Sequence, residues 1–401
     1  MKLLAASILL SFLLFSCSEK GENLSQSDLE IITIDLSKVY DGKLSEFFES
    51  EVDYIWLKDD SEEAQLGNGT DKIEFHGDKI LVLDVFGCKC VKIFDHKGNY
   101  LSKIRAYGDG PGKYLDLDNF MVLNDEVLLL GLYPSKIMWF DLEGEFLREE
   151  KLPFGVKGGA FMENLNRYYF FSENFQVEDF LVRSVNSEFQ DTTYFFPIVE
   201  GRYYGNYSER YNLIKNGQGL YYATPFQDTI FQLQNDEFVP KLVFDYGSYA
   251  QGLDELKRNS EELNALEQME FINRRAKLYF VPSFWNIGES FLYARFRYEE
   301  ASYSVFHDRV KNETSVLNFK IEDDLDGSGT SYFPIFRFDE EKVGSKVLGI
   351  SLYEQLMEKK EEMGEEAFDV FTKGKGKKFA EVATAAKDSE NPVLIIYSLK
   401  K

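Results

Sequence analysis

Two neighbouring stretches of the chain, residues 80–101 and 127–147, follow the same pattern of apolar and polar residues. Each begins with a short apolar run (ILVLD or VLLLG), crosses a polar turn, and continues with a second apolar run (VKIFD or IMWFD). Both end in Asp-x-x-Gly-x-aromatic-Leu, starting at Asp95 and Asp141. Glycine adopts a positive φ and aspartate can bond its own backbone, so this motif predicts a tight turn between antiparallel strands. The motif recurs after about 46 residues, a typical length for one four-stranded propeller blade.

Apolar runs of the same kind continue to the end of the chain. They predict a third blade within residues 168–196, a fourth within 220–244, a fifth within 290–319, a sixth within 331–349 and a closing strand at 392–397. A propeller has to close on itself to remove open sheet edges, and we expect a strand near residues 31–36 to complete the last blade. The predicted fold class is therefore all-β: a six-bladed β-propeller of four-stranded antiparallel blades.

Two stretches depart from the strand pattern and predict helical insertions. Residues 251–280 are rich in Glu, Leu, Arg, Asn and Ala. Residues 351–388 are heavily charged and begin with Leu352, Leu356 and Met357 at helical spacing. Such insertions serve either as lids or contact surfaces on one rim, or as solvated decorations.

A glycine-rich loop, Gly108, Gly110, Pro111, Gly112 and Tyr114, separates the first two repeats. A phosphate-binding loop would precede a helix and end in Lys-Ser or Lys-Thr. This loop does neither, and the residues after it have a strand pattern. We therefore predict a structural connection from one blade to the next.

This loop, the strand after it and the Phe-Asp-x-x-Gly turns together resemble NHL-repeat propellers. More narrowly, they resemble the six-bladed β-propeller lipoproteins of Gram-negative bacteria. The resemblance is sharp over residues 70–152 and diffuse beyond them. It implies a propeller with a lipidated cysteine near the start and a first strand like residues 31–36. The function of that family is mostly unassigned, so the resemblance implies an architecture more than an activity.

The first residues have the pattern of an export signal. Lys2 precedes an apolar run from Leu3 to Phe15, and Ser16 and Cys17 follow. The run is shorter than the about 20 apolar residues that span a bilayer. Cys17 stands where a bacterial lipobox has its lipidated cysteine, although an ordinary signal peptide that contains a cysteine is the alternative. We predict a signal peptide (1–16), a lipidated polar tether (17–29) and a propeller (30–401).

Ser18 after the cysteine resembles the outer-membrane sorting pattern, so we expect a lipid-anchored protein of the cell envelope, at the outer membrane. The formal net charge is −24, or −25 once Lys2 leaves with residues 1–16. Nucleic-acid binding needs clustered Lys and Arg, so this charge argues against a nucleic-acid partner. The expected partners are the membrane through its lipid, an envelope protein or a carbohydrate.

Cys88 and Cys90 are the cysteines that remain. In a strand, two positions that are two residues apart share a face, and such pairs rarely have disulfide geometry. The histidines (His76, His96 and His307) form no cluster in the sequence that could complete a metal site. We therefore expect two separate thiols and a fold that does not rest on a disulfide.

Asp324, Asp326 and Ser328 resemble the opening of a calcium loop, with oxygen donors at alternate positions. A calcium loop needs a bidentate Glu near position 12, where this chain has Ile335. A turn between strands is the preferred interpretation, so we expect no cofactor, with calcium as the alternative.

His307-Asp308-Arg309 is a conceivable acid–base group, but we interpret it as a surface trio at a strand end. The sequence has no Gly-x-Ser-x-Gly elbow, no His-Glu-x-x-His and no paired-cysteine metal motif.

The chain holds 24 Tyr and 36 Phe, most of which the packing of β-blades explains. Tyr203, Tyr204 and Tyr207 lie in a loop-like run and are the best candidates for a ligand-facing surface, for example one that stacks on sugar rings.

Without a catalytic motif, the sequence favours a binding or protein-interaction module, with a role in nutrient (glycan) uptake as one form of it. The alternative is a metal-dependent lactonase or lyase, which would need carboxylates and Asn side chains to converge on a metal at the propeller axis.

Overall fold

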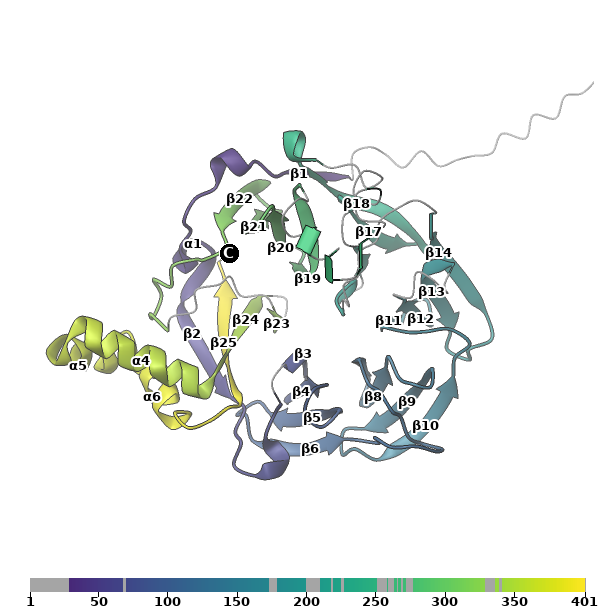
Figure 1. Ribbon diagram of the computed structural model, residues 1–401, viewed down its shortest axis with the longest axis horizontal. Helices are drawn as coiled ribbons and strands as arrows, with labels where there is room; N and C mark the ends of the chain where they lie inside the picture. The colour runs from purple at the N-terminus through teal and green to yellow at the C-terminus, as the bar shows by residue number, and fades with distance from the viewer. Residues whose placement is uncertain are drawn as a thin grey trace, which may run out of the picture.

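Six small antiparallel sheets stand in a ring round a central axis and form a six-bladed β-propeller, as the sequence predicts (Figure 1). The computed structural model describes residues 29–400 apart from 68–69, 173–178, 200–209, 218, 225–226, 251–257, 259–262, 265, 268–269, 272–276, 329–335 and 339–340. In each blade the first strand lies nearest the axis and the fourth lies at the outside of the ring.

The first three blades follow one another along the chain, and their strands pair in sequence order. Blade 1 consists of β3 (Thr70–His76), β4 (Lys79–Asp84), β5 (Cys90–Asp95) and β6 (Tyr100–Ile104). Blade 2 consists of β7 (Asn119–Leu123), β8 (Glu126–Leu130), β9 (Lys136–Asp141) and β10 (Phe146–Lys151). Blade 3 consists of β11 (Gly158–Met162), β12 (Arg167–Phe171), β13 (Phe180–Asn186) and β14 (Thr192–Pro197).

The other three blades complete the ring, and two of them include strands from the start of the chain. Blade 4 consists of β15 (Leu213–Asn216), β16 (Gly219–Tyr222), β17 (Thr229–Gln234) and β18 (Glu237–Asp245), with β1 (Glu30–Thr33) added outside. Blade 5 consists of β19 (Tyr279–Ile287), β20 (Phe291–Tyr298), β21 (Ala301–Asp308) and β22 (Glu313–Asn318). Blade 6 consists of β23 (Phe336–Arg337), β24 (Lys342–Leu348), β25 (Pro392–Leu399) and β2 (Phe48–Trp56).

The strand that closes the ring is β2, and the expectation that residues 31–36 would do so is wrong. β2 pairs antiparallel with β25 from Val52 to Trp56, with a further pair between Phe48 and Leu399. β1 instead runs parallel to β18 of blade 4. Residues 48–56 escaped prediction because Glu49, Glu51 and Asp53 interrupt their apolar residues. Which strand closes the ring also depends on the distant sheet edge that each strand meets.

Between β1 and β2 the chain crosses the outside of blade 5. Tyr40 donates its N–H to the Val316 carbonyl (3.3 Å) and accepts the N–H of Asn318 (3.0 Å). Leu44 opens α1 (Leu44–Phe47) and donates to the Glu322 carbonyl (3.0 Å). The first part of the described chain thus lies against three consecutive blades.

The core lies between the blades, because each sheet is covered on both faces. Successive side chains of a strand point to opposite faces. Leu81 of β4 packs in a cluster with Phe120 of blade 2, while Val82 next to it packs with Leu394 of blade 6. Full burial of such a side chain contributes about 1.5–3 kcal/mol. This packing explains why the central strands are continuous apolar runs rather than alternating ones.

The Asp-x-x-Gly turns have the predicted chemistry. The Asp95 carboxylate accepts the N–H groups of Lys97 and Asn99, both at 2.8 Å, and Gly98 has a φ of 77°. The equivalent turn in blade 2 repeats the arrangement, with Gly144 at a φ of 95°. Each glycine also touches the outer strand of the preceding blade: a Cβ on Gly144 would lie 2.5 Å from the Lys103 carbonyl oxygen. The glycine therefore serves the contact between blades as well as the turn.

The helical insertion predicted at 351–388 is confirmed, and it projects from the ring (Figure 1). It contains α4 (Gly349–Met363), α5 (Glu365–Lys373) and α6 (Lys377–Ala385), between β24 and β25. Leu352, Leu356 and Phe379 are buried in one cluster with Val393 of blade 6. Most of the insertion predicted at 251–280 lies outside the described residues. Short 3-10 helices occupy Leu36–Lys38, Glu62–Ala64 and Gly247–Tyr249.

We expect Gly144→Ala to destabilise the propeller more than Gly77→Ala. Gly77 also has a positive φ (58°), but nothing lies within 4 Å of a Cβ built on it. Gly77→Ala should therefore lower the free energy of unfolding only by the cost of the left-handed backbone, about 1–2 kcal/mol. Gly144→Ala should lower it by roughly 1–3 kcal/mol more, the usual cost of overpacking. Urea denaturation measures both, and equal losses would show that the contact with blade 1 is unimportant.

Candidate functional site

Two kinds of connection meet at one end of the blades, because the strands alternate in direction. These are the turn between the second and third strands and the link from each outer strand to the next blade. Over blades 1 to 3 they are residues 85–89, 105–118, 131–135 and 152–157, which we call the loop face. A pocket of about 390 Å³ opens there. Its lining is Val85, Asp116, Leu117, Asp118, Gly131, Leu132, Tyr133, Pro134, Ser135, Gly155, Val156 and Lys157.

Four large apolar side chains are exposed on the connections that surround this pocket. Phe86 is 72% exposed and Tyr133 is 66% exposed, in the turns of blades 1 and 2, and Tyr107 and Leu115 flank the glycine-rich loop. Tyr133 accepts the N–H of Leu115 through its carbonyl (2.9 Å), so these connections touch. We call the four side chains and the pocket the rim site. Exposed aromatic rings beside a mainly apolar pocket that also offers a few polar groups are typical of ligand-binding surfaces.

The glycine-rich loop connects β6 to β7 and folds back on itself. Gly108 donates its N–H to the Tyr114 carbonyl (2.9 Å), and Tyr114 donates its own to Ala106 (3.1 Å). Gly108, Gly110 and Gly112 all have positive φ, and Pro111 lies between the last two. The Tyr114 ring is fully buried and its hydroxyl donates to the Lys89 carbonyl (2.5 Å). Burial raises the pKa of Tyr114 to about 12. The loop thus anchors the turn of blade 1 to the start of blade 2.

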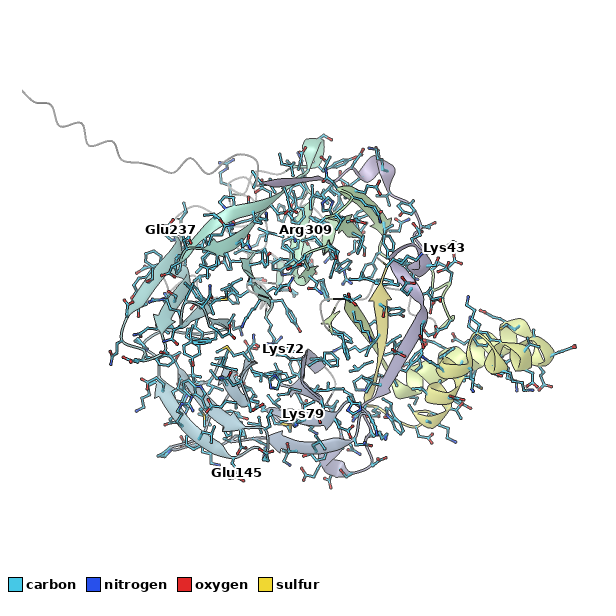
Figure 2. All side chains as sticks on the ribbon, turned by 180° about the vertical axis from the view of Figure 1, so that it is seen from behind. Lys43, Lys72, Lys79, Glu145, Glu237 and Arg309 are labelled. Carbon is cyan, nitrogen blue, oxygen red and sulfur yellow. A yellow bond between two sulfur atoms is a disulfide. The ribbon has the colours of Figure 1, made fainter. Side chains whose placement is uncertain are left out.

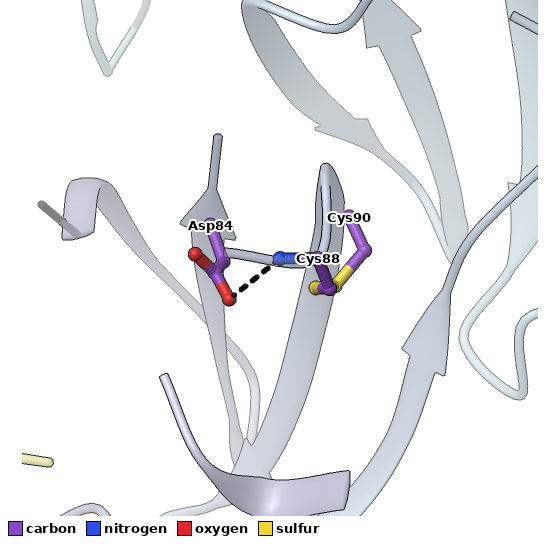
Figure 3. A group of neighbouring side chains, drawn as sticks. All are labelled: Asp84, Cys88 and Cys90. Atoms are coloured by element: carbon purple, nitrogen blue, oxygen red, sulfur yellow. Dashed lines mark hydrogen bonds between the residues drawn. A yellow bond between two sulfur atoms is a disulfide. The ribbon is translucent and has the colours of Figure 1, made fainter. Parts of the chain in front are cut away.

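Cys88 and Cys90 form a disulfide, so the expectation of two separate thiols is wrong (Figure 3). Cys88 belongs to the turn after β4, whereas Cys90 begins β5, so the two do not share a flat strand. Their Cα atoms are 5.2 Å apart, within the range of disulfides. The buried Asp84 carboxylate lies beside them and accepts the N–H groups of Gly87 (2.8 Å) and Cys88 (3.3 Å). Turn 85–89 is therefore held by both a disulfide and a carboxylate.

A second set of charged groups lies at the starts of the inner strands. Asp118 is the acidic residue at the centre of this set. Its carboxylate and its carbonyl accept hydrogen bonds from Arg210, at 2.6 and 2.7 Å, and its carboxylate forms an ion pair with Lys157. Lys72, which points toward the centre of the ring in Figure 2, donates to the Phe120 carbonyl (2.6 Å) and to Asn119 (3.3 Å). We call Lys72, Asp118, Asn119, Lys157 and Arg210 the axial cluster.

The axial cluster joins the inner strands of blades 1 to 4, since its members precede or belong to β3, β7, β11 and β15. Three of its five side chains are cationic, which is unfavourable for a metal ion. Among the described residues, Asp84, Cys88 and Cys90 are the one group of three carboxylate, thiol or imidazole side chains close enough to share a metal. The disulfide occupies both sulfur atoms of that group.

The residues of the suggested calcium loop bind other parts of the protein. Asp324 accepts the N–H (2.9 Å) and hydroxyl (2.5 Å) of Ser45, and Asp326 accepts the Tyr54 hydroxyl and the Ser328 N–H (3.1 Å). Burial raises the pKa of the Asp326 carboxyl. Ile335 lies outside the described residues. These contacts describe a loop packed against blade 6, and the expectation that it binds no cofactor stays a prediction.

The His307-Asp308-Arg309 trio is spread over different contacts. His307 is only 3% exposed, so its interpretation as a surface residue is wrong, and burial lowers its pKa. Its Nδ1 lies 3.0 Å from the Thr314 hydroxyl. Arg309 binds both carboxylate oxygens of Glu30, at 2.9 and 2.5 Å, and so fastens β1 to blade 5. The trio has a structural use.

Cys17, Tyr203, Tyr204 and Tyr207 lie outside the described residues. Among the residues that are described, no helix is both long enough and apolar enough to cross a bilayer.

Sequence reasoning missed the rim site, although one signal pointed to it. Phe86 and Tyr133 both fall in short turns between strands, where a large aromatic side chain has no core position to fill. Their proximity to one pocket depends on adjacent blades and could not be inferred from their spacing.

This chain is similar to other proteins in sequence and in fold. Residues 31–398 match a family described as a domain of unknown function, DUF4934. No curated protein matches the chain. The crystal structure of a candidate exported protein from Bacteroides fragilis is similar over 93% of this chain and 100% of its own, with 19% identity and a TM-score of 0.73. At that identity the likeness shows the fold alone.

A partial likeness covers 62% of this chain and 27% of PorZ, a surface component of the type-IX secretion system of Porphyromonas gingivalis, with 14% identity and a TM-score of 0.34. That likeness supports no inference.

We expect Cys88 and Cys90 of the purified protein to resist alkylation until a reductant is added. Denatured protein treated with iodoacetamide should carry no label on either residue, and both should be labelled after reduction, because the disulfide blocks them. Peptide mass spectrometry measures this. Labelling of both cysteines before reduction would contradict the disulfide.

Proposed function

We propose that this chain, which belongs to the DUF4934 family of domains of unknown function, is an exported, lipid-anchored propeller that binds a carbohydrate at its rim site without catalysis. Export is supported by the signal pattern of residues 1–16 and by the description of the similar Bacteroides fragilis protein. Export and anchoring would place the rim site in the cell envelope, where glycans are available for uptake.

The observation that carries the proposal is the exposure of two aromatic rings: Tyr133, which lines the pocket, and Phe86, which follows the pocket-lining Val85 in the turn of blade 1. A sugar ring has an apolar C–H face and a polar rim of hydroxyl groups. The aromatic rings offer an apolar surface to the face, and Asp116, Ser135 and Lys157 of the pocket lining offer polar groups to the hydroxyls. Buried positions explain most aromatic residues of this chain, but they do not explain these two.

The anchor rests on Cys17. A single acyl chain binds a membrane only marginally, whereas two or more hold a protein stably. The polar residues from Ser18 to Asp28 would form a flexible tether between the lipid and β1. Such an anchor fits a binding protein that presents captured glycan to an outer-membrane uptake assembly.

No specific observation favours the metal-dependent lactonase or lyase. That chemistry needs several carboxylate or amide groups directed at one metal. In the described part of the chain, the axial cluster has one carboxylate and one amide among three cations, and Glu74 of β3 adds a carboxylate that pairs with Lys72 (3.2 Å). Ion pairs therefore neutralise both carboxylates.

We expect Phe86→Ala to weaken carbohydrate binding at least about tenfold, a loss of ~1.4 kcal/mol, because it removes one aromatic surface of the rim site. Phe146→Ala is the matched control: Phe146 is 45% exposed on β10, at the outside of the ring. Affinity electrophoresis against a panel of plant and host polysaccharides, followed by calorimetry on those that bind, measures the change. Phe86→Tyr keeps an aromatic ring and should bind about as tightly as the unchanged protein.

Two results would contradict the proposal. One is the absence of binding to any polysaccharide by the unchanged protein. The other is an equal loss in Phe86→Ala and Phe146→Ala, which would place the ligand away from the rim site.

We also expect Cys17→Ser to move the protein from the membrane fraction to the soluble fraction of the cell envelope, because it removes the acceptor of the lipid. Metabolic labelling with a palmitate analogue should mark the unchanged protein and Cys88→Ser but not Cys17→Ser. A soluble, unlabelled wild-type protein would disprove the anchor.

A further inference from the structure

We propose that the carbohydrate bound at the rim site is anionic and carries uronate carboxylates or sulfate esters. The inference rests on the proposed function and specifies its ligand class. It follows from three cationic side chains, Lys89, Arg105 and Lys113, which lie on the connections that carry the exposed aromatic residues.

Two of these cations share one aromatic ring. The Lys89 ammonium lies 5.3 Å and the Arg105 guanidinium 5.5 Å from the centre of the Tyr107 ring. The electron-rich face of an aromatic ring attracts cations at such distances. Tyr107 therefore holds two like charges close together at the surface, an arrangement that an anion bound between them would stabilise.

The cations are only partly neutralised by the protein. Lys89 forms an ion pair with Asp116 (3.2 Å), whose side chain is 60% exposed. Arg105 donates its Nε–H to the Cys88 carbonyl (2.9 Å), and no other hydrogen bond or ion pair of its guanidinium occurs among the described residues. The exposed Lys113 side chain likewise has no ion pair in the described part of the chain. Arg105 and Lys113 are thus available to a ligand.

The single bond of Arg105 also orients it. Its Nε is held by the carbonyl of Cys88, in the turn that the disulfide closes, so the outer edge of the guanidinium is left for the ligand. A guanidinium edge presents two parallel N–H groups, which match the two oxygens of a carboxylate or sulfate. A neutral sugar that only stacks on aromatic rings would not need a guanidinium at this position.

The local charge differs from that of the whole chain. Over the loop face, Lys89, Arg105, Lys113 and Lys157 against Asp109, Asp116 and Asp118 give a formal charge of 4 − 3 = +1, whereas the complete chain has −24. Charges separated by more than a Debye length, about 8 Å at physiological salt, are largely screened. An anionic polymer at the rim site would therefore interact mainly with these nearby cations and little with the acidic remainder of the protein.

The test compares ligands that differ only in charge. Polygalacturonate is paired with its fully methyl-esterified form, and dextran sulfate with dextran, so each pair keeps the sugar ring and removes the anion. We expect the unchanged protein to bind at least one charged member at least about tenfold more tightly than its neutral partner, and the preference to shrink as salt is raised. The pair that shows the preference identifies carboxylate or sulfate as the anion.

The variants locate that preference. Arg105→Gln combined with Lys113→Gln should abolish the preference and leave weak binding of the neutral polymer. Lys97→Gln, which changes an exposed lysine in the turn at the opposite end of blade 1, should leave the preference intact. Lys113→Gln alone breaks no hydrogen bond in the described structure and should reduce the preference even if the double variant does not fold.

The outcomes separate the two proposals. Equal affinity for the charged and neutral members of both pairs would overturn the anionic ligand and leave carbohydrate binding in place. A charge preference that survives in both Lys113→Gln and the double variant would also overturn the assignment to these residues. Failure to bind any polysaccharide, charged or neutral, would instead contradict the proposed function itself.

Discussion

The pairing of β2 with β25 closes the ring of blades, because β2 is the outer strand of blade 6. The other three strands of that blade come from the last part of the chain. The four antiparallel strands of every other blade are consecutive in the described chain, although β1 adds a fifth, parallel strand to blade 4. Blade 6 therefore differs in that a strand from the start of the chain supplies one of its four antiparallel strands. The packing of blade on blade depends on it: Leu394 of β25 packs with Val82 of blade 1, so an incomplete blade 6 would expose the core on both sides of it. The start of the chain also holds blades 4 and 5 together. Glu30 of β1, which pairs with blade 4, binds Arg309 of blade 5, and the chain after β1 crosses the outside of blade 5.

The rim site is a consequence of that closed ring. Its four exposed apolar side chains come from three connections. Each of these is anchored to a neighbour: Tyr114 to the Lys89 carbonyl, Leu115 to the Tyr133 carbonyl and Arg105 to the Cys88 carbonyl. The disulfide and Asp84 hold the turn from within. A surface assembled in this way is preorganised, and binding to it costs less conformational entropy than binding to loose loops.

Some of this could be predicted from the sequence and some could not. The central strands of the blades and the Asp95 and Asp141 turns were predictable, because apolar runs and turn chemistry act over a few residues. The glycine of those turns was predicted for its φ, but its contact with the preceding blade was not. The Cys88–Cys90 pairing was missed because Cys88 lies in the turn before β5 and Lys89 has a positive φ (48°), so the two cysteines do not have the geometry of strand positions. Tyr203 and its neighbours were chosen as the ligand surface for composition, whereas the described aromatic surface lies at Phe86 and Tyr133.

The sequence by itself determined the repeat, the number of blades, the turns, the helical arm at 351–388 and the absence of a recognisable catalytic motif, since each is a local pattern. The tertiary structure decided which strand closes the ring, which cysteines pair, and which turns surround a common pocket. Those decisions depend on residues from different blades, whose contacts arise only after the sheets have packed. The repeat that limits the chain to a propeller does not predict a ligand, for the same reason. It specifies how each blade is built, whereas the rim site lies where blades meet.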